Sequence, residues 1–114
     1  MTKRMSVKVR KNGKLSVKMD EETWMLIYHS LQCRLYYDHD EIETLEWLLL
    51  LEVFDQVGKM TGKTMVLKKS EFFALFQPGT MKYLDEPTQI LLNEIISPLR
   101  KQLILNKTTN HASY

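Results

Sequence analysis

An Asn-Gly pair between two runs of alternating residues constrains the fold of this chain more than any other feature. The stretch, SVKVRKNGKLSVKM, covers residues 6–19. Asn-Gly in this setting is a strong signal for a β-hairpin, most often with a two-residue type I′ turn. A two-residue loop at Asn12-Gly13 would pair Val7 with Lys18 and place the apolar residues of the two strands on opposite faces. The hydrophobic pattern sets strand register, so this loop is disfavoured.

A three-residue loop over residues 11–13 sorts the side chains into two faces. The resulting apolar pairs are Val9 with Leu15, Val7 with Val17, and Met5 with Met19. Such a loop is a type I turn followed by a left-handed residue in a G1 bulge, and Gly13 stands at that left-handed position. We therefore predict a hairpin with this loop and one apolar face.

The opposite face of the predicted hairpin is polar and contains no acidic residue. Residues 1–19 hold seven basic and no acidic side chains, whereas residues 20–57 hold ten acidic side chains against Arg34 alone. The net charge of +2 hides this separation. We predict that the hairpin binds nucleic acid through Lys8, Arg10, Lys11, Lys14, Ser16 and Lys18.

Duplex DNA is the favoured partner because a two-stranded ribbon fits the major groove. In that arrangement Arg10 is expected to contact guanine, and Lys8, Lys14 and Lys18 are expected to contact phosphates. The alternative is that the lysines only block edge pairing and are neutralised by the acidic helices. The nucleic-acid hypothesis requires a basic surface continuous with Lys63, Lys68 and Lys69, whereas a cover of Glu43, Glu46 or Glu52 would oppose it.

The rest of the chain predicts helices and one further strand. Asp20 is an N-cap for an amphipathic helix that reaches Tyr37. Asp40 and Glu43 resemble a capping box for a second helix, apolar around most of its girth, which ends at Gly58 as C′ residue. This second helix, over residues 41–57, is predicted to form the centre of the core. A short strand over residues 64–68 is predicted to join the hairpin.

The C-terminal half is predicted to hold two more helical regions. A short helix covers residues 71–77, begins near Ser70 and ends at Pro78-Gly79. Asp85 caps a last helix, which Pro98 should kink or split, with Ser97 as cap of the second piece. The fold class is therefore α+β, mostly α: one domain over residues 1–105, with an N-terminal β-hairpin packed on about four helices. Residues 106–114 are predicted to be a flexible polar tail.

No motif is strong enough to name a reaction. The segment 58–64 (GKMTGKT) has three residues between its glycines where a phosphate-binding P-loop has four. His29 and Cys33 have zinc-ligand spacing, but no second pair completes a site. The acidic stretch 38–41 is better explained as a helix start than as acid/base machinery. We expect a non-enzymatic protein without cofactor or metal.

The cellular compartment is predicted from two absent signals and from the cysteine content. The N-terminus has no apolar secretory segment, and no apolar run is long enough to cross a bilayer, so no membrane partner is expected. Cys33 is the single cysteine, which agrees with a reducing environment. We predict a cytoplasmic protein.

The stretch 15–23, LSVKMDEET, followed by two helices resembles the opening of ribbon-helix-helix repressors. In that family two subunits pair their single strands and insert them into the major groove. The resemblance implies that Ser16, Lys18 and Lys14 contact DNA. The competing hypothesis is a protein interaction or self-associating helical module without nucleic acid, for which Met25, Tyr36 and Tyr37 are exposed apolar candidates.

Overall fold

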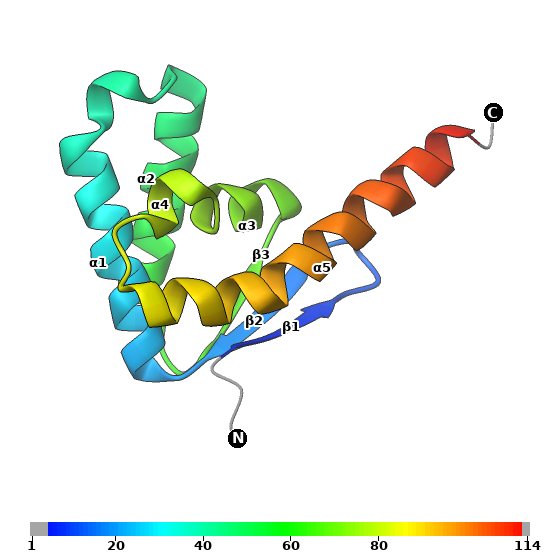
Figure 1. Ribbon diagram of the computed structural model, residues 1–114, viewed down its shortest axis with the longest axis horizontal. Coiled ribbons are helices and arrows are strands. Elements are labelled where there is room, and N and C mark those ends of the chain that lie inside the picture. Colours follow the sequence, from blue (N-terminus) through cyan, green and yellow to red (C-terminus); the bar gives the residue numbers. More distant parts are fainter. Residues whose placement is uncertain (1–4, 113–114) are drawn as a thin grey trace.

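The computed structural model describes residues 5–112, with side chains described as far as Leu103. In Figure 1 the N-terminal hairpin lies in the lower part of the molecule, the third strand runs upward behind the C-terminal helix, and the other helices lie above and to the left. The fold is α+β and mostly α, as the sequence predicts. The elements are β1 (Met5–Val9), β2 (Leu15–Met19), α1 (Glu21–Tyr37), the 3₁₀ helix η1 (His39–Glu41), α2 (Thr44–Lys59), β3 (Thr64–Leu67), α3 (Lys69–Leu75), α4 (Pro78–Met81) and α5 (Glu86–Ala112).

The hairpin has the predicted register and loop. Met5 lies opposite Met19, Val7 opposite Val17 and Val9 opposite Leu15. Across the loop, the Arg10 amide donates to the Lys14 carbonyl at 2.8 Å. Gly13 has a φ of 85°, in the left-handed region that a G1 bulge requires.

The third strand joins the sheet as predicted, and the strand order is β1-β2-β3. β3 pairs antiparallel with β2, with Leu67 opposite Leu15 and Thr64 opposite Lys18. β2 is therefore the central strand and has no free edge. The strand pairing between two subunits that the ribbon-helix-helix resemblance implies is wrong for this chain, because both sides of β2 are already hydrogen-bonded within it.

Helix α1 ends at Tyr37 as predicted, and it is capped as predicted. The Asp20 carboxylate accepts a hydrogen bond from the Thr23 amide at 3.1 Å. The side chains at the spacing of one helical stripe, Trp24, Ile27, Leu31 and Leu35, are all buried. This stripe turns α1 toward the core, where each fully buried aliphatic side chain contributes about 1.5–3 kcal/mol.

Two predictions about the ends of α2 are wrong. The helix begins at Thr44, and its cap Glu43 makes no side-chain hydrogen bond, so Asp40 and Glu43 form no capping box. Gly58 lies inside the last turn and not at C′. A Cβ there would lie 3.1 Å from Cε1 of Tyr28, so packing and not left-handed backbone explains this glycine.

The prediction that α2 forms the centre of the core is also wrong. Its buried residues are Leu50, Val53 and Val57, whereas three of its leucines are exposed. The helix packs against α1 and α3 through one side and leaves the other side exposed. Leu50 and Val53 are fully buried, but they share the core with side chains of the sheet, α1 and the C-terminal half, which include Leu15, Ile27, Leu67, Phe72, Phe76, Leu92 and Ile96.

The C-terminal half differs from prediction at two of its three prolines. Pro78 does not end a helix; it is the first residue of α4, where proline's missing donor costs nothing. α5 is capped by Asp85, which accepts from the Thr88 amide at 3.2 Å. The helix continues through Pro98, so the prediction that it splits there, with Ser97 capping a second piece, is wrong. Pro98 is exposed, so water can reach the Glu94 carbonyl that lacks its helical donor.

The backbone of residues 106–112 continues α5, where the sequence predicts a tail. Ser113 and Tyr114 lie outside the described residues, and the flexibility of the segment stays a prediction. Within the described part of the chain, no helix combines the length and the apolar character needed to span a membrane.

Candidate functional site

The register of the sheet gathers the cations of the hairpin on one face. The inner face is closed, since Leu15, Val17, Met19, Met65 and Leu67 are all buried. Side chains alternate along a strand, so their neighbours point away from the helical body. This outer surface, hereafter the basic face, consists of Ser6, Lys8, Arg10, Lys14, Ser16 and Lys18 of the hairpin with Thr64 and Val66 of β3.

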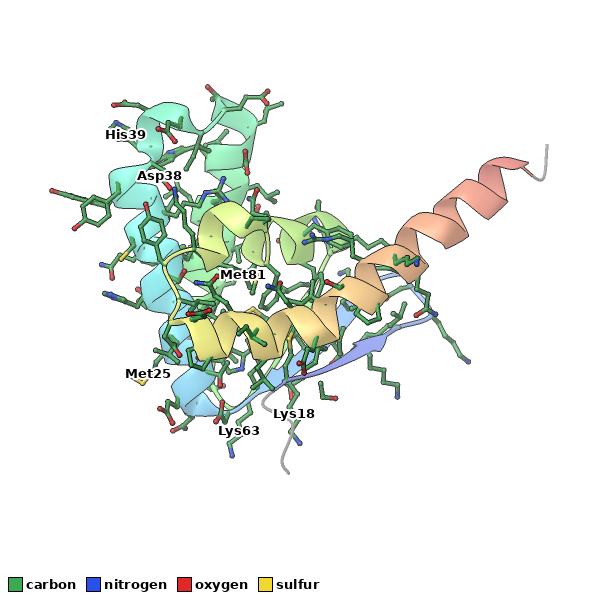
Figure 2. The ribbon with its side chains drawn as sticks, viewed as in Figure 1. Lys18, Met25, Asp38, His39, Lys63 and Met81 are labelled. Atoms are coloured by element: carbon green, nitrogen blue, oxygen red, sulfur yellow. The ribbon has the colours of Figure 1, made fainter. Side chains whose placement is uncertain are left out.

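The basic face is open to solvent and extends beyond the hairpin. Lys8, Arg10, Lys14 and Lys18 are exposed, and Ser16 is half-buried at the centre of the sheet. Lys11 is exposed in the loop. Lys63 and Lys68, the residues on either side of β3, are exposed as well. Figure 2 shows the side chains of Lys18 and Lys63 pointing away from the helices.

The acidic residues do not cover the basic face. Among the described residues, salt bridges involve the cations Arg34, Lys59 and Lys82, and none reaches a cation of the sheet. Glu46 forms a salt bridge with Arg34, with 3.0 Å between Oε1 and Nη2. Glu43 and Glu52 are exposed at the start and on the outer side of α2. The tip of the α1–α2 pair, which carries the acidic stretch 38–43, lies at the opposite end of the molecule from the sheet (Figure 1).

A groove of about 740 Å³ lies beside α1, next to the end of the sheet. One wall is the exposed side of α1, and the other is the end of α2 with the loop before β3, from Val57 to Gly62. The α1 wall consists of Glu21, Trp24, Met25, Tyr28, His29 and Gln32. Sequence analysis missed this groove, although the six residues follow the spacing i, i+3, i+4, i+7, i+8 and i+11, which marks one side of a helix.

The groove is tied to the sheet through the carbonyl of Lys63. This oxygen accepts one hydrogen bond from Trp24 Nε1, at 2.8 Å, and one from the Met19 amide, at 2.9 Å. The ring of Tyr28 is held by stacking on Phe54, with centroids 4.5 Å apart and planes inclined by 10°. The wall of the groove and the end of the basic face are therefore built from the same hydrogen-bonded corner.

A polar cluster joins the end of α1 to the turn that follows α4. The Asp38 carboxylate accepts a hydrogen bond from the Tyr83 hydroxyl, at 2.9 Å, and lies 2.9 Å from Lys82 Nζ. The hydrogen bond from Lys82 is the main cause that lowers the pKa of Asp38, and the same contact raises the pKa of Lys82. Partial burial is the main cause that raises the pKa of Tyr83. The cluster, hereafter the clamp, holds the end of α1 against the turn after α4. These contacts give Asp38 a structural role and explain the shift of its pKa without a catalytic one.

The remaining candidates do not form a reactive site. His29 Nε2 lies 3.7 Å from Cys33 Sγ, a weak contact on the outside of α1. Within the described residues, no three His, Cys, Asp or Glu side chains lie close enough together to hold a metal ion. His39 contacts Asp40 at 2.9 Å, and both are exposed. Residues 58–64, the imperfect P-loop, cover the end of α2, the loop after it and the first residue of β3, so no helix follows directly to present amides to phosphate.

Comparisons with protein-family models, with curated proteins and with solved structures found no match.

Proposed function

We propose that this protein binds nucleic acid through the basic face of its sheet, in an accessory or regulatory role without catalysis. The observation that supports this is the open concentration of cations without counter-charge: Lys8, Arg10, Lys14 and Lys18 are exposed, and no carboxylate of the described residues pairs with them. A surface lined by one sign of charge attracts a polyanion and raises its association rate.

The third strand changes how the basic face would meet its ligand. Neighbouring strands lie about 4.8 Å apart, so a three-stranded sheet with its side chains is too wide to enter the major groove as a two-stranded ribbon does. The face also carries no aromatic side chain on which a base could stack. Its chemistry is that of phosphate contact, which positions a strand without reading its sequence.

The test compares two double variants that each remove two positive charges. Lys8→Gln with Lys18→Gln removes two cations from the basic face, and Lys59→Gln with Lys101→Gln removes two exposed cations from α2 and α5. Removing one phosphate-binding lysine should reduce the slope of log Kobs against log salt by about one. We expect the first variant to bind labelled oligonucleotides at least tenfold more weakly at low salt, and the second to bind like the wild type.

Equal effects of the two double variants would contradict the proposal, because they would show a response to net charge alone. Absence of salt-sensitive binding to both single-stranded and duplex oligonucleotides would end it. Circular dichroism of each variant provides the control for folding.

A second candidate function is self-association through α2. Leu45, Leu48 and Leu51, hereafter the leucine stripe, follow one another at intervals of three residues and are 74, 56 and 38% exposed. Tyr36 and Tyr37, at the end of α1, are 76 and 69% exposed. Contiguous apolar surface of this kind often marks a protein interface.

The two candidate functions are expected to respond to salt concentration in opposite directions. The exposed carboxylates of Glu41 and Glu52 flank the leucine stripe, so two copies in contact there would bring like charges together. High salt screens that repulsion and should strengthen self-association, whereas it weakens nucleic-acid binding. Sedimentation velocity of the wild type and of Leu48→Gln tests this. A monomer at every salt and protein concentration would exclude self-association.

A further inference from the structure

We propose that the groove beside α1 takes one unstacked base of a single-stranded nucleic acid whose phosphates lie on the basic face. This inference deepens the proposed function and rests on it. Proteins that recognise single strands combine cations for the backbone with aromatic surfaces for splayed bases. The basic face offers the first and lacks the second, so binding of a single strand in this way requires a base-binding surface beside it.

The groove lies next to the corner of the sheet at which the basic face ends. The Lys63 carbonyl receives hydrogen bonds both from Trp24 in the groove wall and from the end of β2, and Thr64 lies opposite Lys18 in the sheet. Figure 2 shows Met25 at the lower end of α1, the same end of the molecule at which Lys18 and Lys63 project. A strand held by these two lysines would therefore pass the mouth of the groove.

The dimensions and the apolar lining suit a flat heteroaromatic ring. The volume of about 740 Å³ falls within the roughly 300–1,000 Å³ of small-molecule sites. Tyr28 is immobilised by its stack on Phe54, so its ring is a preformed surface. Met25, 72% exposed, adds a polarizable thioether beside it. Both side chains can pack against a base of any sequence.

The polar lining adds a preference among bases. Glu21 places an acceptor-only carboxylate in the groove, and Gln32 adds an amide that both donates and accepts. A carboxylate accepts hydrogen bonds from exocyclic amino groups such as that of cytosine, which thymine and uracil lack. Glu21 also repels phosphate, which keeps the backbone outside, on Lys18 and Lys63. We infer a preference for bases that carry an amino group.

The experiment measures fluorescence anisotropy of the full chain with labelled oligo(dC), oligo(dT) and a duplex of equal length. The wild type should bind oligo(dC) about tenfold more tightly than oligo(dT), and both more tightly than the duplex. Glu21→Gln should remove the oligo(dC) preference. Its matched control is Glu22→Gln. Glu22 is the next residue in the chain and carries the same charge, but its side chain is exposed and does not line the groove.

A second pair of variants tests stacking. Tyr28→Leu should weaken both single strands about tenfold, within the range for removal of one base–aromatic stack, and leave duplex binding unchanged. Tyr36→Leu removes an exposed tyrosine of the same helix outside the groove, and it should change nothing. Should Tyr28→Leu fail to fold, Glu21→Gln still decides the matter, because Glu21 is exposed.

The outcomes separate the two proposals. If Glu21→Gln and Tyr28→Leu keep the wild-type affinities and the wild-type ratio, while Lys8→Gln with Lys18→Gln loses binding, the basic face stands and the groove takes no base. Binding to the duplex as tight as to oligo(dC) would likewise overturn the groove. If no oligonucleotide binds in a salt-sensitive way, the basic face fails and the groove proposal fails with it.

Discussion

Arg34 on α1 donates to the carboxylate of Glu46 on α2 at 3.0 Å, and its side chain is only 9% exposed. The other guanidinium nitrogen, Nη1, donates to the Thr80 hydroxyl at 3.0 Å, while Nε has no partner among the described residues. A Cβ on Gly79 would lie 3.0 Å from the guanidinium carbon, so α4 packs directly against this charge. The buried cation thus joins three helices, and it depends on Glu46 for compensation.

Replacing Glu46 by Ala should destabilise the fold by about 2 kcal/mol. Breaking a fully buried pair costs roughly 3–5 kcal/mol, and Glu46 is one-third exposed, so water can partly solvate the orphaned guanidinium. Urea denaturation measures the change. Asp55→Ala is the control, because it removes an exposed i,i+4 pair with Lys59 that should contribute less than about 0.5 kcal/mol. Equal destabilisation in the two variants would show that Arg34 does not need Glu46.

Gly13 should be the residue of the hairpin loop that tolerates substitution least. Its φ of 85° costs an L-residue about 1–2 kcal/mol, although a Cβ would meet no atom within 4 Å. Gly13→Ala should therefore destabilise by about 1 kcal/mol, and Gly13→Asn by less, since Asn tolerates left-handed backbone. Thermal unfolding measures both, with Lys11→Ala as a neutral control in the same loop. An unchanged Tm for Gly13→Ala would contradict the bulge.

The hairpin could be predicted in detail because its information is local. Residues 5–19 contain both the alternation and the turn glycine, and only one register places all the apolar side chains on the same face. The cap at Asp20 and the exposed tyrosines at 36 and 37 are equally local features. By contrast, the glycine at 58 looked like a helix end, because the ring of Tyr28 that it accommodates lies thirty positions earlier in the chain.

The features that could not be predicted from the sequence depend on how the helices pack against one another. The leucines of α2 indicated a central helix, yet burial is decided by where α2 packs, and only one of its faces meets the body. The candidate cations were found from sequence, and the structure brings Lys8, Arg10, Lys14 and Lys18 together on one open face, with Lys11 in the adjoining loop. The groove was missed because its two walls come from residues 21–32 and 57–62, which only the tertiary fold brings together.

The clamp between Asp38 and Lys82 should make the free energy of unfolding depend on pH under acidic conditions. Lys82 lowers the pKa of Asp38 below its ordinary 3.8, so the folded state binds this proton less readily than the unfolded chain. The stabilisation is complete above about pH 5 and is lost as pH falls through 3.8 and then through the lower pKa of the folded state. Asp38→Asn should lower Tm near neutral pH.

The difference in Tm between wild type and Asp38→Asn should shrink as the solution is acidified from about pH 7 to about pH 3. Asp40→Asn is a suitable comparison, since Asp40 is exposed and its salt bridge is with the exposed His39 at the same tip of the α1–α2 pair. A difference between wild type and Asp38→Asn that stays constant with pH would show that the carboxylate charge is not what stabilises the clamp.

Pro98 is expected to cost the protein stability, because α5 passes through it without a break. Proline is about 3 kcal/mol less favourable than Ala within a helix, but it also restricts the unfolded chain, an effect of up to about 1 kcal/mol in its favour. Pro98 is exposed, so Ala at this position leaves no cavity and restores a donor to the Glu94 carbonyl. Pro98→Ala should therefore stabilise the fold by at least about 1 kcal/mol in urea denaturation. Ser97→Ala distinguishes the two forms of the helix: replacing an N-cap would destabilise by about 1 kcal/mol, whereas replacing a residue within a continuous helix should not destabilise at all.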